Sequence, residues 1–457
     1  MENQVVFGSD LQAMQGRLDT HRMSSDGHSI LPAINAIPAE ILINIFRYFQ
    51  PAYFGPKCDI PPIVDLIRVC KHWRTVALNE SSLWSTINLD NPKHFHVTMV
   101  RQWLERSKAC PLILSLRVYH LHEAEEMTVL VETVLSIFIQ HLCRWSSIAL
   151  HLGNVPIRSQ SPLLNLPVSH SAAPLLEKVH IYHIGSSTPE VCRTLWKAIG
   201  SYPSVRSAEW IEGNDLGTCL SSVLSAPWKN LIHLTSRFLL DDAFLKFLAG
   251  CPTLEFLHII SLHESNSPLN PRPRISLPSL HTLSCSSYPS IPLSQLLDHL
   301  EVPKLTSLIL NDYCGQWISL LERSACRLRD LSIYVRAWPE VDISQLLLSS
   351  PMTHVEKLDV TLASSKLSAD SILQALTQKE GVTSLPSLRQ LKLYLSGFQA
   401  GLLSTMLESR LSDSSCSLRK ISLNLSLGRS ARNGGDSADI EFLKNLKIDG
   451  VDLEYFL

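Results

Sequence analysis

Two pairs of histidines have the spacing in this sequence that comes closest to that of metal ligands. They are His94 with His96 and His120 with His122. A structural zinc site usually needs about four ligands, and neither pair has cysteines at ligand spacing. We therefore interpret these histidines as surface or strand residues, and we expect no metal and no cofactor.

Cysteine is the other side chain here that could act as a nucleophile. The chain has 11 cysteines, widely scattered and without a CxxC pair. A catalytic cysteine needs a base and a third group to orient that base, and none of the 11 stands out. The GxxxxGK[ST], GxGxxG and GxSxG motifs of nucleotide-binding proteins and hydrolases are also absent. These observations favour a protein that is not an enzyme.

The cysteines instead follow the pattern of small apolar residues. Five of them lie within apolar stretches: Cys70, Cys143, Cys251, Cys285 and Cys326. We expect these five to be reduced and buried, as in an intracellular protein.

Length and composition limit the classes of protein that need to be considered. At 457 residues the chain is longer than a typical domain, so a small module and a large one are expected. A net charge of −2 gives no reason to expect nucleic acid or an anionic membrane as a partner. The first ten residues lack the apolar core of a signal peptide, and no apolar run reaches the roughly 18 residues of a membrane span. We expect the protein in the cytoplasm, the nucleus or both.

The segment from Ile37 to Trp84 predicts three short helices. The first should begin at Pro38, because proline fits the first helical position. Apolar residues at one-face spacing follow it: Ile41, Leu42, Ile45, Phe46 and Phe49. A second helix should open at Pro61-Pro62, and a third should run from about His72 to Asn79.

These helices carry more apolar surface than so small a unit can bury. Ile45-Phe46 and Val69-Cys70 are adjacent apolar pairs, and adjacent helix residues point about 100° apart. The pairs widen the apolar stripe of each helix beyond what two small partner helices cover. An exposed apolar patch of this kind marks a partner site.

This segment resembles the F-box motif. The matching elements, in order, are Ile37-Pro38, Glu40, Ile41-Leu42, Ile45-Phe46, Val69-Cys70, Trp73-Arg74 and Leu83-Trp84. The resemblance implies docking onto a Skp-type adaptor that is bound to a cullin scaffold. By the same resemblance, the docking residues would be Pro38, Ile41, Leu42, Ile45, Phe46, Val69, Cys70 and Trp73.

A repeat begins at about residue 112 and continues to the C-terminus. The unit places apolar residues at the first, fourth and sixth positions, as in PTLEFLHI, PSLHTLSC and PKLTSLIL, and the copies are about 23 to 33 residues apart. Helical patterns lie between the copies, so each repeat should form a strand followed by a helix. We predict an α/β solenoid, a leucine-rich-repeat horseshoe of about twelve strands, with an N-terminal three-helix F-box module. The expected divisions are a flexible tail 1–33, the F-box 34–90, a helical linker 91–111 and the repeats 112–457.

The repeats also resemble those of F-box/leucine-rich-repeat proteins, especially the expanded fungal families. In each predicted strand the variable residues between the apolar ones should face the concave surface. Those we expect to contact a bound target protein are His180, Tyr182, Glu209, His258, Tyr334, Lys357, Asp359, Lys392 and Tyr394. Mixed charge and several aromatic residues are typical of protein interfaces. The alternative for each position is an ordinary solvated side chain.

The resemblance implies a substrate receptor of an SCF-type ubiquitin ligase. The F-box would bind the adaptor, and the repeats would hold a target protein for ubiquitination. The alternative is a scaffold or inhibitor outside any ligase, in which the F-box only caps the solenoid. These two hypotheses differ in whether the apolar patch of the helical segment is exposed.

Overall fold

The computed structural model of the chain contains two compact units. Among the described residues, the first unit consists of residues 37–48 and 62–83, and the second begins at Trp84. The structure describes residues 37–48, 62–119, 124–155, 157–158, 160–183, 189–212, 228–265, 274–286, 290–311, 315–335, 340–362, 369–378, 384–412, 418–426, 437–446 and 452–456. The expected tail, 1–33, lies outside these residues.

The first unit is built from short helices, as expected. They are α2 (Ala39–Tyr48), α3 (Pro62–Val69) and α4 (Lys71–Asn79). The 3-10 turn η3 (Ser81–Trp84) follows and ends at the first residue of the second unit. Helix α2 begins one residue later than expected, because Pro38 lies at its cap. The Pro38 carbonyl accepts the N–H groups of Ile41 and Leu42, each at 3.1 Å. Phe49 lies outside the described residues.

Aromatic and aliphatic side chains from all three helices form the core of this unit. Phe46 is 0% exposed, and its ring lies 5.0 Å from that of Trp73, tilted by 59°. Ile63 and Leu66 bury the inner face of α3. The Arg74 side chain ties α4 to α3, since its Nε donates to the Ile67 carbonyl at 2.9 Å. Trp73-Arg74, a pair in the motif, therefore has a structural role inside the unit.

Within the described residues, the second unit contains a sheet of 14 strands in sequence order, and all the strand pairs described in it are parallel. Its strands are β1 (Thr86–Asp90), β2 (Leu112–Arg117), β3 (Trp145–Gly153), β4 (Lys178–His183), β5 (Ser207–Glu212), β6 (His233–Leu240), β7 (Phe256–Glu264), β9 (Thr282–Cys285), β11 (Ser307–Leu310), β12 (Asp330–Val335), β13 (Lys357–Leu362), β14 (Gln390–Ser396), β15 (Lys420–Ser426) and β16 (Asp452–Phe456). Two short strands, β8 (Ile275–Ser276) and β10 (Leu300–Glu301), pair separately. Parallel neighbours require a crossover in every repeat.

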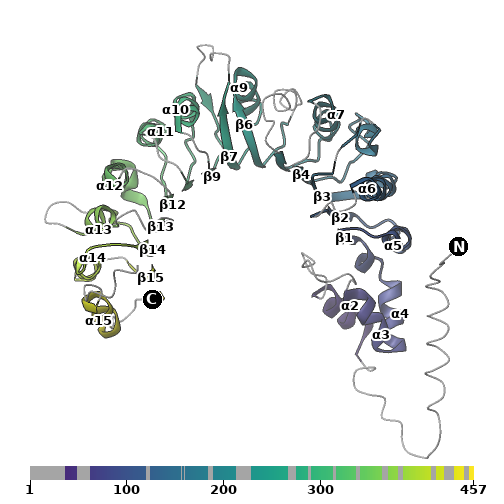
Figure 1. Cartoon of the computed structure of the whole chain (residues 1–457), viewed down its shortest axis with the longest axis horizontal. Coiled ribbons are helices and arrows are strands. Elements are labelled where there is room, and N and C mark those ends of the chain that lie inside the picture. The colour runs from purple at the N-terminus through teal and green to yellow at the C-terminus, as the bar shows by residue number, and fades with distance from the viewer. Residues whose placement is uncertain are drawn as a thin grey trace, which may run out of the picture. The chain divides into compact units, whose positions relative to one another are not determined.

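Helices provide most of these crossovers. They are α5 (His94–Arg106), α6 (Ala124–Ile139), α7 (Pro189–Ile199), α9 (Asp242–Ala249), α10 (Ser290–His299), α11 (Gln316–Ser324), α12 (Glu340–Leu348), α13 (Asp370–Leu376), α14 (Leu402–Leu411) and α15 (Ser437–Asn445), with the 3-10 turns η4 (Leu142–Arg144), η5 (Pro162–Asn165) and η6 (Ser350–His354). Figure 1 shows the described helices of this unit on one side of its strands. This arrangement is consistent with an α/β solenoid.

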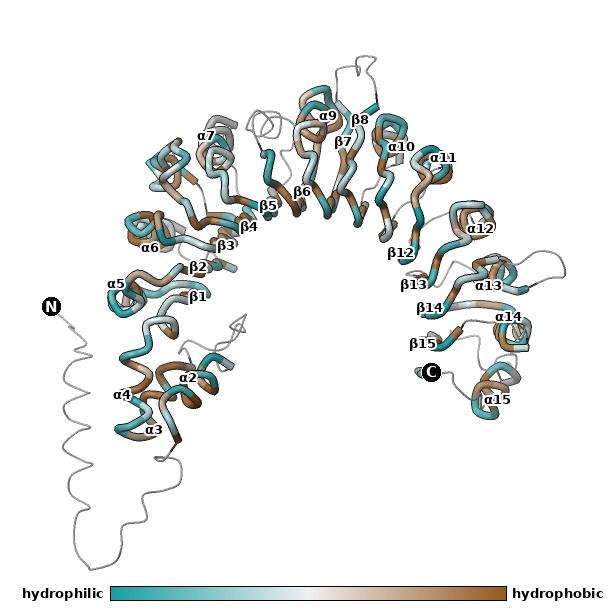
Figure 2. Tube along the Cα trace, turned by 180° about the vertical axis from the view of Figure 1, so that it is seen from behind, coloured by the Kyte–Doolittle hydropathy of each residue, from teal (hydrophilic) through white to brown (hydrophobic). Residues whose placement is uncertain are grey.

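Several strands, β4, β6 and β13 among them, alternate between buried apolar residues and solvent-facing ones, which places the core between the sheet and the helices. In β13, Leu358, Val360 and Leu362 are at most 2% exposed, whereas Lys357 and Asp359 face solvent. On the helix side, Ile372 and Leu373 of α13 are equally buried. Figure 2 shows hydrophobic residues in both layers of the unit. We call the side of the sheet that carries no described helix the open face; its residues are the solvent-facing strand positions.

The parallel sheet begins earlier than the repeats predicted from the sequence, and it has more than the expected twelve strands. Strand β1 pairs with β2 from Thr86 onward. Helix α5, within the expected linker 91–111, is the crossover of this first repeat. Ile87 and Leu89 are at most 2% exposed, so the five residues TINLD alternate between buried and more exposed positions, as a strand does. The stretch is too short to be noticed as a repeat in the sequence. Trp84, the last residue of the motif, packs its ring edge-on 5.5 Å from Trp103.

Two arginines, Arg410, which is buried, and Arg323, which is half-buried, join consecutive helices near their ends. Arg410 of α14 donates from Nε to the Leu376 carbonyl, the last residue of α13, at 2.6 Å. Arg323 of α11 donates to the Leu297 carbonyl in α10 at 2.7 Å. The last carbonyls of a helix have no partner within the helix, so each guanidinium satisfies groups that would otherwise be buried and unpaired.

Within the described part of the chain, no helix is both long and apolar enough to cross a membrane.

Candidate functional site

Helix α2 carries two apolar stripes, and only one of them is used by the core. Leu42 and Phe46, one turn apart, are 0% exposed. Ile41, Ile45 and Tyr48 follow the neighbouring stripe; Ile41 is 51% exposed and Tyr48 is 91% exposed. Ile45 is half-buried. Such an exposed stripe on a short helix is suited to bind a partner by burial of apolar area.

The other predicted docking residues lie at the junction of α3 and α4 or just before α2. Val69 is 51% exposed, and Pro38 is exposed as well. Cys70 and Trp73 are half-buried. The Cys70 sulfur caps α4 by accepting the Trp73 N–H at 3.4 Å, which gives Cys70 a structural role.

Leu42 and Phe46, two of the residues predicted to dock an adaptor, lie in the core of the first unit, and their part in docking stays a prediction. Neither side chain has any solvent exposure, because their stripe packs onto α4 through the Phe46–Trp73 ring pair. They hold α2 in place and so support the exposed stripe. The sequence alone could not separate the two stripes, since both are equally apolar.

On the second unit, the open face holds the residues predicted to contact a target. His180, Tyr182, Glu209, His258, Tyr334 and Asp359 are half-buried, and Lys357, Lys392 and Tyr394 are exposed. The strand register aligns many of them in rows across the sheet: His180 lies opposite Glu209, and Asp359 lies opposite Lys392. Their contact with a target remains a prediction.

A histidine cluster occupies the open face on β3 to β5. The His151 and His180 rings stack at 4.4 Å, and His180 Nδ1 lies 2.6 Å from Glu209 Oε2. The His180 hydrogen bond lowers the pKa of Glu209, an effect that outweighs the burial of this carboxyl. On the other side of His151, Arg117 and Asp90 form an ion pair at 3.8 Å. The sequence analysis missed His151, Arg117 and Asp90. Asp90 lies in the overlooked strand β1, and Arg117 lies in its neighbour β2.

The half-buried His151 of this cluster should make the chain less stable in mild acid. Burial, together with His180 and Arg117, lowers the pKa of His151 from its usual 6.5 to about 4. Protonation therefore favours the unfolded chain, and stability falls as the pH drops from about 6.5 to about 4. Glu209 affects stability in a lower pH range. Its lowered pKa means that its carboxylate stabilises the folded chain, and this stabilisation is lost only as the pH falls below 4.5, the ordinary pKa of the group.

Between pH 7 and pH 5, protonation of His151 should lower the free energy of unfolding of the natural chain by about 1–2 kcal/mol. We expect this contribution to be absent from the His151→Gln chain. Urea unfolding of both chains at the two pH values measures it. His354→Gln, at an exposed histidine in η6, is the matched control and should keep the full loss. An equal loss in the His151→Gln chain would contradict this account.

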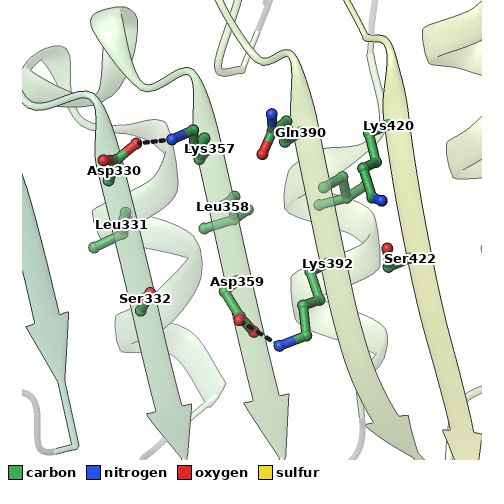
Figure 3. Close-up of a pocket in the computed structure, with 11 residues that line it drawn as sticks. Asp330, Leu331, Ser332, Lys357, Leu358, Asp359, Gln390, Lys392, Lys420 and Ser422 are labelled. Carbon is green, nitrogen blue, oxygen red and sulfur yellow. Dashed lines mark hydrogen bonds and ion pairs between the residues drawn. The ribbon is translucent and has the colours of Figure 1, made fainter. Parts of the chain in front are cut away.

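An ion-pair ladder occupies the open face at the other end of the sheet. Lys357 Nζ lies 3.6 Å from Asp330, and Lys392 Nζ lies 2.9 Å from Asp359. Lys420 lies 3.3 Å from Asp452 and 3.2 Å from Glu454. The strands β12 to β15 line a shallow pocket of about 240 Å³ here, shown in Figure 3.

Metal and cysteine chemistry gain no support from the described residues. His96 is 3% exposed, and its Nδ1 accepts the Lys93 N–H, whereas His94 pairs with Glu126 at 2.8 Å. His120 and His122 lie outside the described residues. No cluster of metal ligands occurs within the described ranges.

Three of the five cysteines expected to be buried are buried, namely Cys251, Cys285 and Cys326. Burial raises the pKa of the Cys251 thiol to about 12, which keeps it protonated and unreactive. Cys70 is half-buried, as described above. Cys143 is exposed, contrary to the prediction, because it lies in the turn η4 that follows helix α6.

Comparison with known proteins identifies the first unit. Residues 34–90 match the family model described as F-box-like. A search of curated proteins finds no match to the chain. The match confirms the F-box prediction for this segment. In general terms, an F-box domain indicates an adaptor role in an SCF-type ubiquitin ligase. Such domains generally bind Skp-type adaptors, and the proteins that carry them are typically not catalytic.

Proposed function

We propose that this chain is the substrate-recognition subunit of an SCF-type, cullin-RING ubiquitin ligase. The F-box-like match at residues 34–90 is the observation that carries this proposal. The exposed apolar side chains of α2 and α3 supply the surface that a Skp-type adaptor would cover. The adaptor in turn joins the chain to a cullin scaffold, in the cytoplasm, the nucleus or both.

The second unit would hold the target. We propose that its repeats are of the leucine-rich type and form a horseshoe related to those of fungal F-box proteins. Fourteen strands about 4.8 Å apart give a sheet wide enough to hold a folded protein. The contribution to ubiquitination is proximity: the target's lysines are kept near a conjugating enzyme, which raises their effective concentration. Protein breakdown would follow from that modification.

A scaffold or inhibitor outside any ligase is the second candidate. It is favoured by the structural roles of motif residues inside the first unit: Phe46 and Trp73 form its core, and Cys70 caps α4. The motif residues could therefore have only a structural role, in folding the first unit as a cap for the repeats. Exposure of Ile41 and Val69 favours the ligase, because a cap gains nothing from exposed apolar side chains.

Assembly of the complex by co-expression of its subunits tests the proposal. We expect the full chain, co-expressed with a Skp-type adaptor, a cullin and its RING subunit, to elute with all three from a size-exclusion column as one equimolar complex. The chain with Ile41→Asp and Val69→Asp should elute alone. If the natural chain, soluble and folded, also elutes alone, the receptor function is wrong and the scaffold is favoured.

A further inference from the structure

The ladder on the open face follows a rule of charge pairing that one strand pair breaks. Three neighbouring strand pairs set a lysine opposite an aspartate in the register: Asp330 with Lys357, Asp359 with Lys392, and Lys420 with Asp452. Opposite charges at facing positions stabilise a sheet, and like charges destabilise it. The rule accounts for the ion pairs described above.

The exception is the pair formed by β14 and β15. Here Gln390 lies opposite Lys420, and Lys392 lies opposite Ser422, so no carboxylate occupies any of the four positions. Figure 3 shows Gln390 between Lys357 and Lys420, and all three residues line the pocket. Gln390 is exposed, and its side-chain amide makes no hydrogen bond within the part of the chain that the structure describes.

Three lysines therefore surround a neutral amide. Lys357 and Lys420 face Gln390 from the neighbouring strands, and Lys392 lies two residues along the same strand. Each lysine pairs with a carboxylate, and two of these carboxylates, Asp330 and Asp359, also line the pocket. The positions directly opposite Gln390 on the two neighbouring strands are both lysines, so no carboxylate faces the amide across the register. A carboxylate placed beside Gln390 would accept hydrogen bonds from the amide and from ammonium groups.

We propose that this pocket binds an acidic side chain, aspartate or glutamate, presented by the bound target protein. The inference rests on the proposed function, in which the target lies on the open face. The pocket, at about 240 Å³, falls below the roughly 300–1,000 Å³ of small-molecule sites, so a single side chain suits it better than a metabolite.

A substitution at Gln390 tests the charge argument without any ligand. Gln390→Glu supplies the missing carboxylate from within the chain, so we expect a thermal midpoint at or above that of the natural chain. Gln390→Lys adds a fourth positive charge and should lower the midpoint. The difference between the two variants should shrink in about 1 M salt, which screens exposed charges. Equal midpoints in low salt would overturn the proposal.

A peptide probe tests recognition itself. We would measure fluorescence anisotropy in low salt with a labelled Gly-Ser peptide that carries two central glutamates, and with its glutamine counterpart. The glutamate peptide should bind more tightly to the natural chain. Lys392→Gln with Lys420→Gln should weaken it about fivefold or more, and Gln390→Glu should weaken it as well, because the pocket is then occupied.

The matched control is Lys178→Gln, at an exposed lysine of the open face on β4, which should leave binding unchanged. Equal binding of the two peptides, or no binding of either, would overturn the proposal. Tighter binding of a phosphoserine version of the peptide would show that the pocket prefers a phosphate to a carboxylate, and this would also overturn the proposal. None of these measurements uses the adaptor, so a failure here is distinguishable from a failure of the ligase proposal.

Discussion

Replacing both Ile41 and Val69 by aspartate should abolish binding of a Skp-type adaptor without unfolding the chain. Both side chains are 51% exposed, so the folded unit loses little buried area. At an interface hot spot, loss of an apolar anchor typically costs at least about 2 kcal/mol. Two such losses weaken binding about a thousandfold. Isothermal titration with purified adaptor measures the affinity, and circular dichroism checks the fold.

The chain offers a close control for this variant. Leu348, in α12 of the second unit, is a 52% exposed apolar residue, so Leu348→Asp matches the substitution in chemistry and exposure. It should leave adaptor affinity unchanged. Adaptor binding that survives Ile41→Asp with Val69→Asp at its natural strength would rule out the exposed stripe as the docking surface.

Phe46→Ala would give an ambiguous result in the same assay. Phe46 is fully buried against Trp73, and loss of a buried phenylalanine costs about 3–5 kcal/mol, which is a large fraction of what so small a unit can have. The variant would lose adaptor binding because the unit unfolds. Only the exposed residues can separate docking from folding.

The helices of the first unit and the strand-helix repeat of the second could be predicted from sequence because each rests on a local pattern. The spacing of apolar residues predicted α3 and α4 to within a residue, and PSLRQLKL correctly marks β14 (Gln390–Ser396). Similar copies repeated along the chain made the sheet predictable even though each copy alone is weak.

What could not be predicted depends on contacts between distant residues. The choice between the stripes of α2 depends on which one meets Trp73, 27 residues after Phe46 in the sequence. The histidine cluster depends on a register that brings together β3, β4 and β5. The sequence analysis overlooked the first strand, Thr86–Asp90, because its five residues alone do not identify it. Its pairing with β2 is what makes it part of the sheet.

Arg410→Ala should destabilise the C-terminal repeats by about 3 kcal/mol. Arg410 is 4% exposed, and besides the Leu376 carbonyl it binds the Ser384 carbonyl at 3.0 Å and the Ser384 hydroxyl at 2.9 Å. Ser384 is also buried, at 4% exposure, so alanine leaves several polar groups without partners away from water. Each loss of a hydrogen bond to a charged group costs about 1.5–3 kcal/mol. Urea unfolding measures the total.

The location of this effect is a further expectation, because each repeat of a solenoid contacts only its neighbours. Hydrogen exchange should rise in α13 and α14 and stay unchanged in α5 and α6. Arg389→Ala is the control: its side chain is 60% exposed and lies 3.8 Å from Glu356, so its removal should cost at most about 0.5 kcal/mol. If both variants lost the same stability, Arg410 would contribute no more than a surface charge, and the packing of leucines alone would hold consecutive repeats together.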